Sequence, residues 1–164
     1  MQPSSADAPF DDQDYFFEPW WAGARAIALS ERGSLRLQVS GLADALAAFP
    51  ELAELPGQLT EDGVVLDGTL LVLDDAGRPD AELLRARLAG QGLPGRPAYV
   101  AGDLLWAGGE AVVKRSFRVR RRWLESVLTP GDRITVTGSL HNGSDGRQFV
   151  SVDDAAGHQL DLTT

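Results

Sequence analysis

The residues with the clearest chemical character lie at positions 18–25, which read Glu-Pro-Trp-Trp-Ala-Gly-Ala-Arg. Two tryptophans directly precede a turn that contains glycine, and the residues that follow have the composition of a strand. An indole nitrogen is not basic, so position 20 offers aromatic surface and no nucleophile. Of the 15 lysine and arginine residues, Lys114 alone is a lysine. Chemistry that needs a side-chain amine therefore has one candidate.

The run resembles the nucleotide-attachment motif of the ATP-dependent DNA ligases, especially the bacterial single-domain and multifunctional repair type. In that pattern Glu-Pro precedes Lys-x-Asp-Gly-x-Arg, and the lysine attacks the α-phosphate of ATP. Here Trp20 stands in the place of the lysine and Ala22 in the place of the aspartate. The remaining positions still fit the pattern, namely Glu18, Pro19, Trp21, Gly23 and Arg25.

Two later segments resemble further ligase motifs. Residues 63–74 are similar to the strand that carries Leu-Asp-Gly-Glu, whose glutamate contacts the ribose and helps to place metal, and Thr69 replaces that glutamate. A hydroxyl brings no negative charge for a divalent cation. Residues 98–106 are similar to Tyr-Val-x-Phe-Asp-Leu-Leu-Trp, with Gly102 in place of the phenylalanine near the adenine. We therefore expect a vestigial nucleotide pocket, partly filled by Trp20, at Trp20, Trp21, Ala22, Arg25, Thr69 and Gly102.

The pattern of the chain predicts hairpins and short helices without an alternating strand and helix rhythm. Strands are expected at residues 25–30, 34–39, 63–74 and 98–106, and a final three-stranded meander at 133–140, 148–153 and 158–162. We expect the meander to complete the sheet that the absent final ligase motifs would have formed. Helices are expected at residues 42–49, ended by Pro50, at 81–88, capped by Asp80, and at 114–128.

The helix predicted at residues 114–128 carries six basic side chains and one acidic side chain. Its expected apolar stripe consists of Val119, Trp123, Leu124, Val127 and Leu128. A solvated helix face is the ordinary interpretation of such a segment. The alternative is a patch for DNA phosphates or an acidic protein partner, formed by Lys114, Arg115, Arg118, Arg121 and Arg122.

Composition limits the range of functions. A chain of 164 residues, 43% of them hydrophobic, suits one domain, which we place at residues 10–164 behind a disordered leader at residues 1–9. A net charge of −9 argues against DNA binding over the whole surface. The chain has no cysteine and no apolar run of membrane-spanning length, so we expect a soluble cytoplasmic protein. His141 and His158 match no metal-ligand spacing, and we expect neither metal nor cofactor.

The resemblance implies an α+β nucleotidyltransferase fold of antiparallel sheets flanked by helices, truncated and without the small β-barrel domain. Our leading hypothesis is a ligase-like pseudoenzyme that serves as a binding or regulatory module, linked to DNA repair through the family alone, with an unidentified protein partner. The alternative is a residual ATP- or AMP-binding protein, or a nucleotidyltransferase in which Lys114 is a displaced nucleophile.

Overall fold

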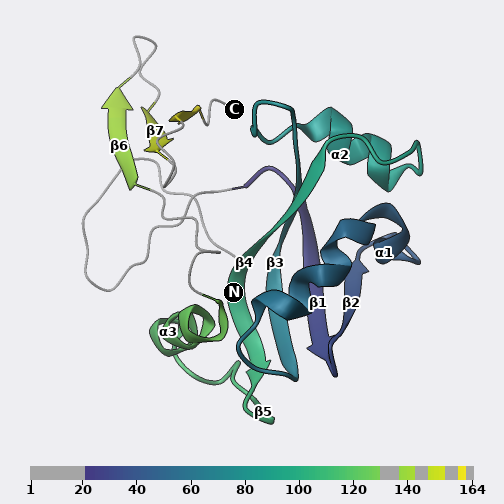
Figure 1. Cartoon of the computed structure of the whole chain (residues 1–164). Coiled ribbons are helices and arrows are strands. Elements are labelled where there is room, and N and C mark those ends of the chain that lie inside the picture. The colour runs from purple at the N-terminus through teal and green to yellow at the C-terminus, as the bar shows by residue number, and fades with distance from the viewer. Residues whose placement is uncertain (1–20, 130–136, 143–147, 154–158, 162–164) are drawn as a thin grey trace.

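The computed structural model describes residues 21–129, 137–142, 148–153 and 159–161 (Figure 1). The leader expected at residues 1–9 and the side chain of Trp20 lie outside the described residues. Within the described part, antiparallel sheets are flanked by short helices, so the expected α+β class is confirmed. No helix of this part is long and apolar enough to cross a membrane.

The centre of the fold is a five-stranded antiparallel sheet with the order β2-β1-β3-β4-β5. Its strands are β1 (Ala24–Glu31), β2 (Ser34–Val39), β3 (Val64–Leu73), β4 (Arg96–Ala107) and β5 (Glu110–Ala111). The predicted hairpin between β1 and β2 is confirmed. Arg32 and Gly33 form its turn with φ values of 52° and 70°, the left-handed pair that suits a tight hairpin.

Three helical segments connect the first four strands and cover one face of the sheet. The helix expected at residues 42–49 is shorter, α1 (Ala45–Ala48), and Pro50 opens a 3-10 helix, η1 (Pro50–Gln58), that the sequence did not suggest. The helix α2 (Ala81–Leu88) has the predicted bounds. Its N-cap Asp80 accepts hydrogen bonds from the amides of Glu82 and Leu83 at 2.8 and 3.0 Å.

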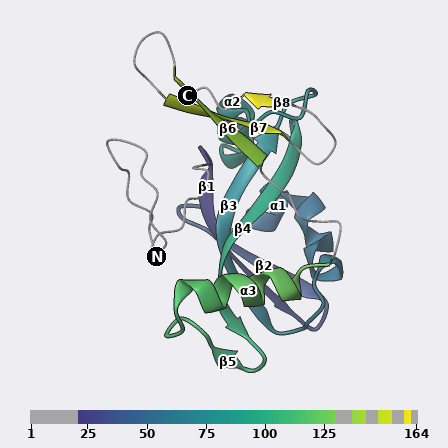
Figure 2. The same cartoon turned by 90° about the vertical axis from the view of Figure 1, so that its left-hand side faces the viewer.

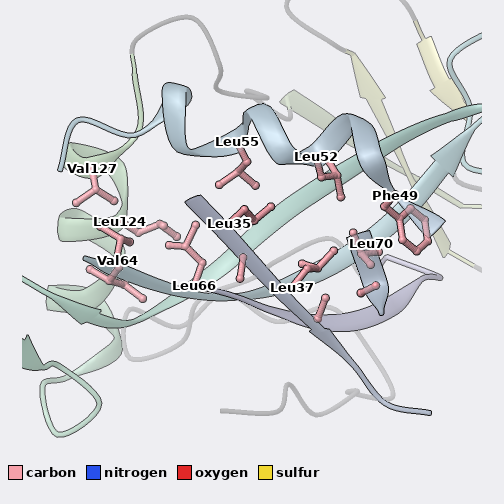
Figure 3. Packing of buried hydrophobic residues seen from close by; sticks show 14 of the residues in the cluster. Leu35, Leu37, Phe49, Leu52, Leu55, Val64, Leu66, Leu70, Leu124 and Val127 are labelled. Carbon is pink, nitrogen blue, oxygen red and sulfur yellow. The ribbon is translucent and has the colours of Figure 1, made fainter. Parts of the chain in front are cut away.

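The hydrophobic core lies between the sheet and these helices (Figure 3). Alternate residues of β1, β2 and β3 point into it because side chains alternate between the two faces of a strand. The close-up labels the leucines and valines of the sheet below the side chains of the α1–η1 segment, with Leu124 and Val127 of the last helix at one end.

Arg87 is the largest fully buried side chain of the described residues, and it ties α2 to its surroundings. Its guanidinium donates to both carboxylate oxygens of Glu51 at 3.0 and 2.8 Å and to the carbonyls of Ala48, Leu93, Pro94 and Gly95. These bonds satisfy a charge that burial alone would make very costly. The hydrogen bond from Arg87 also holds the pKa of Glu51 below its usual value.

The last helix of the described chain is α3 (Phe117–Val127), which packs against β4 (Figure 2). The expected apolar stripe is wrong at one position. Val119 is 44% exposed, and the buried face is formed by Arg120, Leu124 and Val127. Arg120 occupies the buried face because the buried Asp103 of β4 requires a counter-ion.

The predicted C-terminal meander is present as β6 (Thr137–Asn142), β7 (Gln148–Asp153) and β8 (Gln159–Asp161). The first strand ends two residues later than expected, so His141 lies within it, and residues 133–136 lie outside the described residues. Among the described residues, the three strands form a sheet of their own, in the order β6-β7-β8, so the expectation that the meander completes the main sheet is wrong.

Candidate functional site

The face of the five-stranded sheet that is turned away from η1 holds Arg25 and Thr69, two of the five described residues of the predicted pocket. We call it the open face. Cross-strand pairing assigns to it a set of polar and apolar side chains from four strands, namely Arg25, Ile27, Leu29, Arg36, Val65, Asp67, Thr69, Leu71 and Val100. Most of the apolar members are half-buried, in contrast to the fully buried leucines of the core face.

A bidentate ion pair links the two central strands on the open face. Arg25 donates from Nε to Asp67 Oδ1 at 2.9 Å and from a terminal nitrogen to Oδ2 at 2.5 Å. The carboxylate is nearly buried, with 11% of its side chain exposed, whereas the arginine is 58% exposed. The hydrogen bonds to Asp67 raise the pKa of Arg25. The arginine that the ligase pattern retains is therefore already bound by a carboxylate of the same chain.

Thr69 is the residue of β3 directly opposite Arg25. The structure brings these two predicted pocket residues together, with Val100 of β4 on the other side of Thr69. Neither Thr69 nor Val100 carries a carboxylate, and the acid that binds Arg25 is Asp67, two residues before Thr69 on the same face of β3.

Gly68 lies where β3 and the ring of Tyr99 come into contact. A Cβ atom at Gly68 would lie 2.3 Å from the carbonyl oxygen of Val100 and 2.7 Å from the Tyr99 ring. The Tyr99 hydroxyl lies 3.1 and 3.2 Å from the carbonyl oxygens of Leu66 and Ala26, to which it donates. Burial, and secondarily the charge of Asp67, raises the pKa of Tyr99. The glycine of the Leu-Asp-Gly sequence is therefore required by packing.

A second carboxylate stands beside the first, because Asp103 of β4 is the register partner of Asp67. It forms a buried bidentate pair with Arg120 of α3, in which Nε and a terminal nitrogen donate at 2.8 Å each. The third guanidinium nitrogen of Arg120 donates to the carbonyl of Arg115 at 2.6 Å. The hydrogen bond to Asp103 raises the pKa of Arg120. Each of the two adjacent acids thus has its own arginine.

Gly102 is the extra residue of a β-bulge. The pairing moves from Gly68 with Ala101 to Asp67 with Asp103, which leaves Gly102 without a register partner. Its carbonyl accepts a hydrogen bond from Arg121 of α3 at 3.0 Å. Among the described residues, a Cβ atom at this position would meet nothing closer than the Asp67 carbonyl at 3.8 Å. These residues therefore leave room for a methyl group where the ligase pattern has phenylalanine.

The other predicted residues are placed as follows. Trp21 is half-buried, and its carbonyl accepts from the amide of Gly23 at 2.9 Å, whereas Ala22 is exposed. In the predicted basic patch, Arg121 is half-buried and the other four members are exposed, namely Lys114, Arg115, Arg118 and Arg122. Arg115 lies 3.4 Å from Glu110. The patch residues all belong to α3 and the turn before it.

Sequence reasoning missed Asp103 and Arg120 as a pair. The available signal was an aspartate inside each of two apolar strands, since a buried carboxylate requires a partner. The partner itself was not visible, because Arg120 was counted only as one of the six basic side chains of residues 114–128 and was given no role of its own. The groove between η1 and β4 was also missed. Its volume is about 330 Å³, and Glu51, Glu54, Gln58, Pro97 and Tyr99 are among its lining residues.

Comparisons with known proteins relate the chain to DNA ligases. It is 32% identical over 126 residues to the multifunctional non-homologous end joining DNA repair protein LigD of Mycobacterium tuberculosis, covering 71% of this chain and 16% of that protein. It is 30% identical over 155 residues to DNA ligase C1 of Mycolicibacterium smegmatis, covering 86% and 43%. It is 26% identical over 140 residues to the SPbeta prophage-derived DNA ligase-like protein LigB of Bacillus subtilis, covering 85% and 51%.

The solved structures give the same relationship. The ligase domain of M. tuberculosis LigD is similar with a TM-score of 0.56 and 33% sequence identity, covering 65% of this chain and 34% of that one. A mycobacterial DNA ligase D complexed with ATP and MES has a TM-score of 0.56 and 32% identity, covering 66% and 35%. No family model matches the chain. The chain spans between 16% and 51% of the length of the three relatives described above.

We predict that Arg120→Ala destabilises the protein by about 3–5 kcal/mol, because it leaves Asp103 buried without its counter-ion and next to Asp67. The matched control is Arg122→Ala, two residues away on the exposed face of the same helix, which should change stability by less than about 0.5 kcal/mol. Urea unfolding followed by circular dichroism measures both. Equal effects of the two substitutions would contradict the assigned role of Arg120.

The two glycines of the site are expected to differ in their tolerance of a methyl group. Gly68→Ala should destabilise the protein by about 1–3 kcal/mol, because the added carbon overlaps the Val100 carbonyl and the Tyr99 ring. Gly102→Ala should be neutral or stabilising by up to about 1 kcal/mol, since the position is open and alanine restricts the unfolded chain. Thermal unfolding of both variants checks this, and a larger loss at Gly102 would refute the bulge geometry.

Proposed function

The chain is related to the ligase domain of the ATP-dependent DNA ligase family in sequence and fold, and from that premise we propose that it is a non-catalytic member of the family. Its scaffold serves as a binding or regulatory module in bacterial DNA repair, in the cytoplasm. The proposal rests on the residues that stand at the ligase motif positions and on the arrangement of the described ones on the open face.

The observation that carries the proposal is the state of Arg25 and its neighbours. Arg25 is held by Asp67, while Thr69 opposite it brings no carboxylate for a metal ion. Capture of adenylate requires an amine that bonds to the α-phosphorus as the bond to pyrophosphate breaks. At the motif position the chain has Trp20, which has no such amine. The scaffold features persist, and the reacting group is missing.

A second candidate function draws on the place of the single lysine. Lys114 precedes Arg115, whose carbonyl accepts from the Arg120 side chain that binds Asp103. Lys114 is thus the sequence neighbour of a residue whose backbone contacts the Arg120–Asp103 pair. In the alternative function, Lys114 replaces the missing nucleophile and the protein still reacts with ATP.

Incubation with ATP labelled in its α-phosphate and a divalent metal, followed by a denaturing gel, separates the two functions. We expect no covalent label on the wild-type chain. Lys114 is the only lysine, so Lys114→Ala removes every side-chain primary amine in one step. Label that disappears in Lys114→Ala and persists in the matched charge-loss control Arg122→Ala would contradict the non-catalytic function.

The surface best suited to an anionic partner is the exposed side of α3 with the turn before it. Lys114, Arg118 and Arg122 are exposed there, and Arg120 and Arg121 hold the helix to β4 through Asp103 and the Gly102 carbonyl. A row of exposed cations can bind the phosphates of a DNA backbone. The relatives of the chain are DNA ligases, which makes DNA the favoured anion. We propose DNA as the partner of this surface, with an acidic protein as the remaining possibility.

Titration of a fluorescent DNA duplex at two or more salt concentrations tests this surface. Removing two phosphate contacts with Arg118→Ala and Arg122→Ala should weaken binding and reduce the slope of log affinity against log salt by about 2. The control changes the same charge elsewhere, with Arg78→Ala and Arg85→Ala, two arginines in exposed pairs near α2. Equal losses in both double variants would show a general charge effect and refute the α3 surface.

A further inference from the structure

The open face is only partly covered by the described residues. Ile27, Leu29, Val65 and Val100 are half-buried on it, although they lie in central strands whose other face is fully packed. Leu71 behaves differently, since it is 2% exposed and yet does not belong to the hydrophobic core cluster. The open face is therefore already shielded from solvent at the end that holds Leu71.

The start of β1 shows which segment reaches that end. A Cβ atom at Gly23 would lie 2.5 Å from the Thr69 side chain and 2.7 Å from the Leu71 side chain. The chain therefore crosses closely over two side chains of the open face just before β1 begins. Trp21, two residues earlier, is half-buried. Gly23 thus brings the chain to the Thr69 and Leu71 end of the open face, and residues 10–20 come shortly before it in the sequence.

The composition of that preceding segment matches the face. Residues 10–20 contain five aromatic side chains, Phe10, Tyr15, Phe16, Phe17 and Trp20, and four acidic ones, Asp11, Asp12, Asp14 and Glu18. The open face offers apolar side chains and two exposed arginines, Arg25 and Arg36, while its acid Asp67 is already paired. Aromatic rings bury large areas, and acids beside arginines gain further attraction.

We propose that the open face is the docking surface for the chain's own residues 10–20, which would cover Arg25 and Thr69 of the expected nucleotide pocket. The reach is sufficient, because eleven extended residues span up to about 36–40 Å, whereas neighbouring strands lie about 5 Å apart. Docking covers the half-exposed apolar side chains with the aromatic rings. The docking proposal rests on the proposed function, because a protein that bound ATP at Arg25 and Thr69 would need this face to be free.

The chain has no cysteine, so a designed disulfide tests the contact without background. In the full chain, Phe16→Cys is combined with Val100→Cys on the open face. The matched control combines Phe16→Cys with Glu54→Cys, which is exposed on η1 and lines a groove with Pro97 and Tyr99 on the other side of the sheet. Five residues separate position 16 from Trp21, a reach of up to about 18 Å that does not favour either side.

Under mild oxidation, a non-reducing gel with mass spectrometry should show an intramolecular crosslink for the Val100 pair at least tenfold faster than for the Glu54 pair. Equal rates, or no crosslink with Val100→Cys in a folded protein, would overturn the docking. The second measurement leaves every described residue unchanged. Replacing Phe16, Phe17 and Trp20 by serine should raise the fluorescence of a dye that binds apolar surface severalfold, and an unchanged signal would also overturn it.

These outcomes are independent of the adenylation assay. Covalent label from ATP would contradict the non-catalytic function. The crosslinking rates would still decide whether residues 10–20 dock on the open face. Absence of the Val100 crosslink and of the dye signal would refute the docking, whatever the chain does with ATP.

Discussion

Two buried carboxylates on adjacent strands set the main constraint on this fold. Asp67 and Asp103 face each other across β3 and β4, where like charges repel unless each is compensated. Arg25 compensates one from β1, and Arg120 compensates the other from α3. The two ion pairs therefore also hold secondary structure together, because they connect β1, β3 and β4 with α3, the last helix of the described chain. The position of α3 on β4 follows from it.

The same constraint explains why the scaffold survives changes in the reacting groups. Gly68, Tyr99, Asp67 and Arg25 are held by packing and charge compensation, so replacing any of them costs stability whether or not the protein reacts with ATP. Positions such as Thr69 and Gly102 touch no such constraint: the first is half-buried, and the second has open space. A ligase-like fold can thus persist while the groups that would act on a nucleotide change.

The charge distribution follows from the same arrangement. The chain has a net charge of −9, yet basic side chains gather on α3. Some of these positive charges lie inside the fold. Arg120 neutralises a buried acid, and Arg121 binds the bulge carbonyl. The outer members of the helix are thereby held in place at the surface. Structural and surface arginines of one helix look alike in sequence, although their physical roles differ.

The sequence by itself determined the four long strands of the main sheet, the α2 helix with its Asp80 cap and the ligase relationship, because alternation, capping and motif spacing are local properties of the chain. It did not determine that Arg120 is buried and Val119 exposed, that η1 continues from Pro50, or that Arg25 is bound by Asp67. Those features depend on which distant groups meet. The bulge at Gly102 and the counter-ion of Asp103 exist only once β3, β4 and α3 pack together, since a buried charge selects its partner in space and not along the chain.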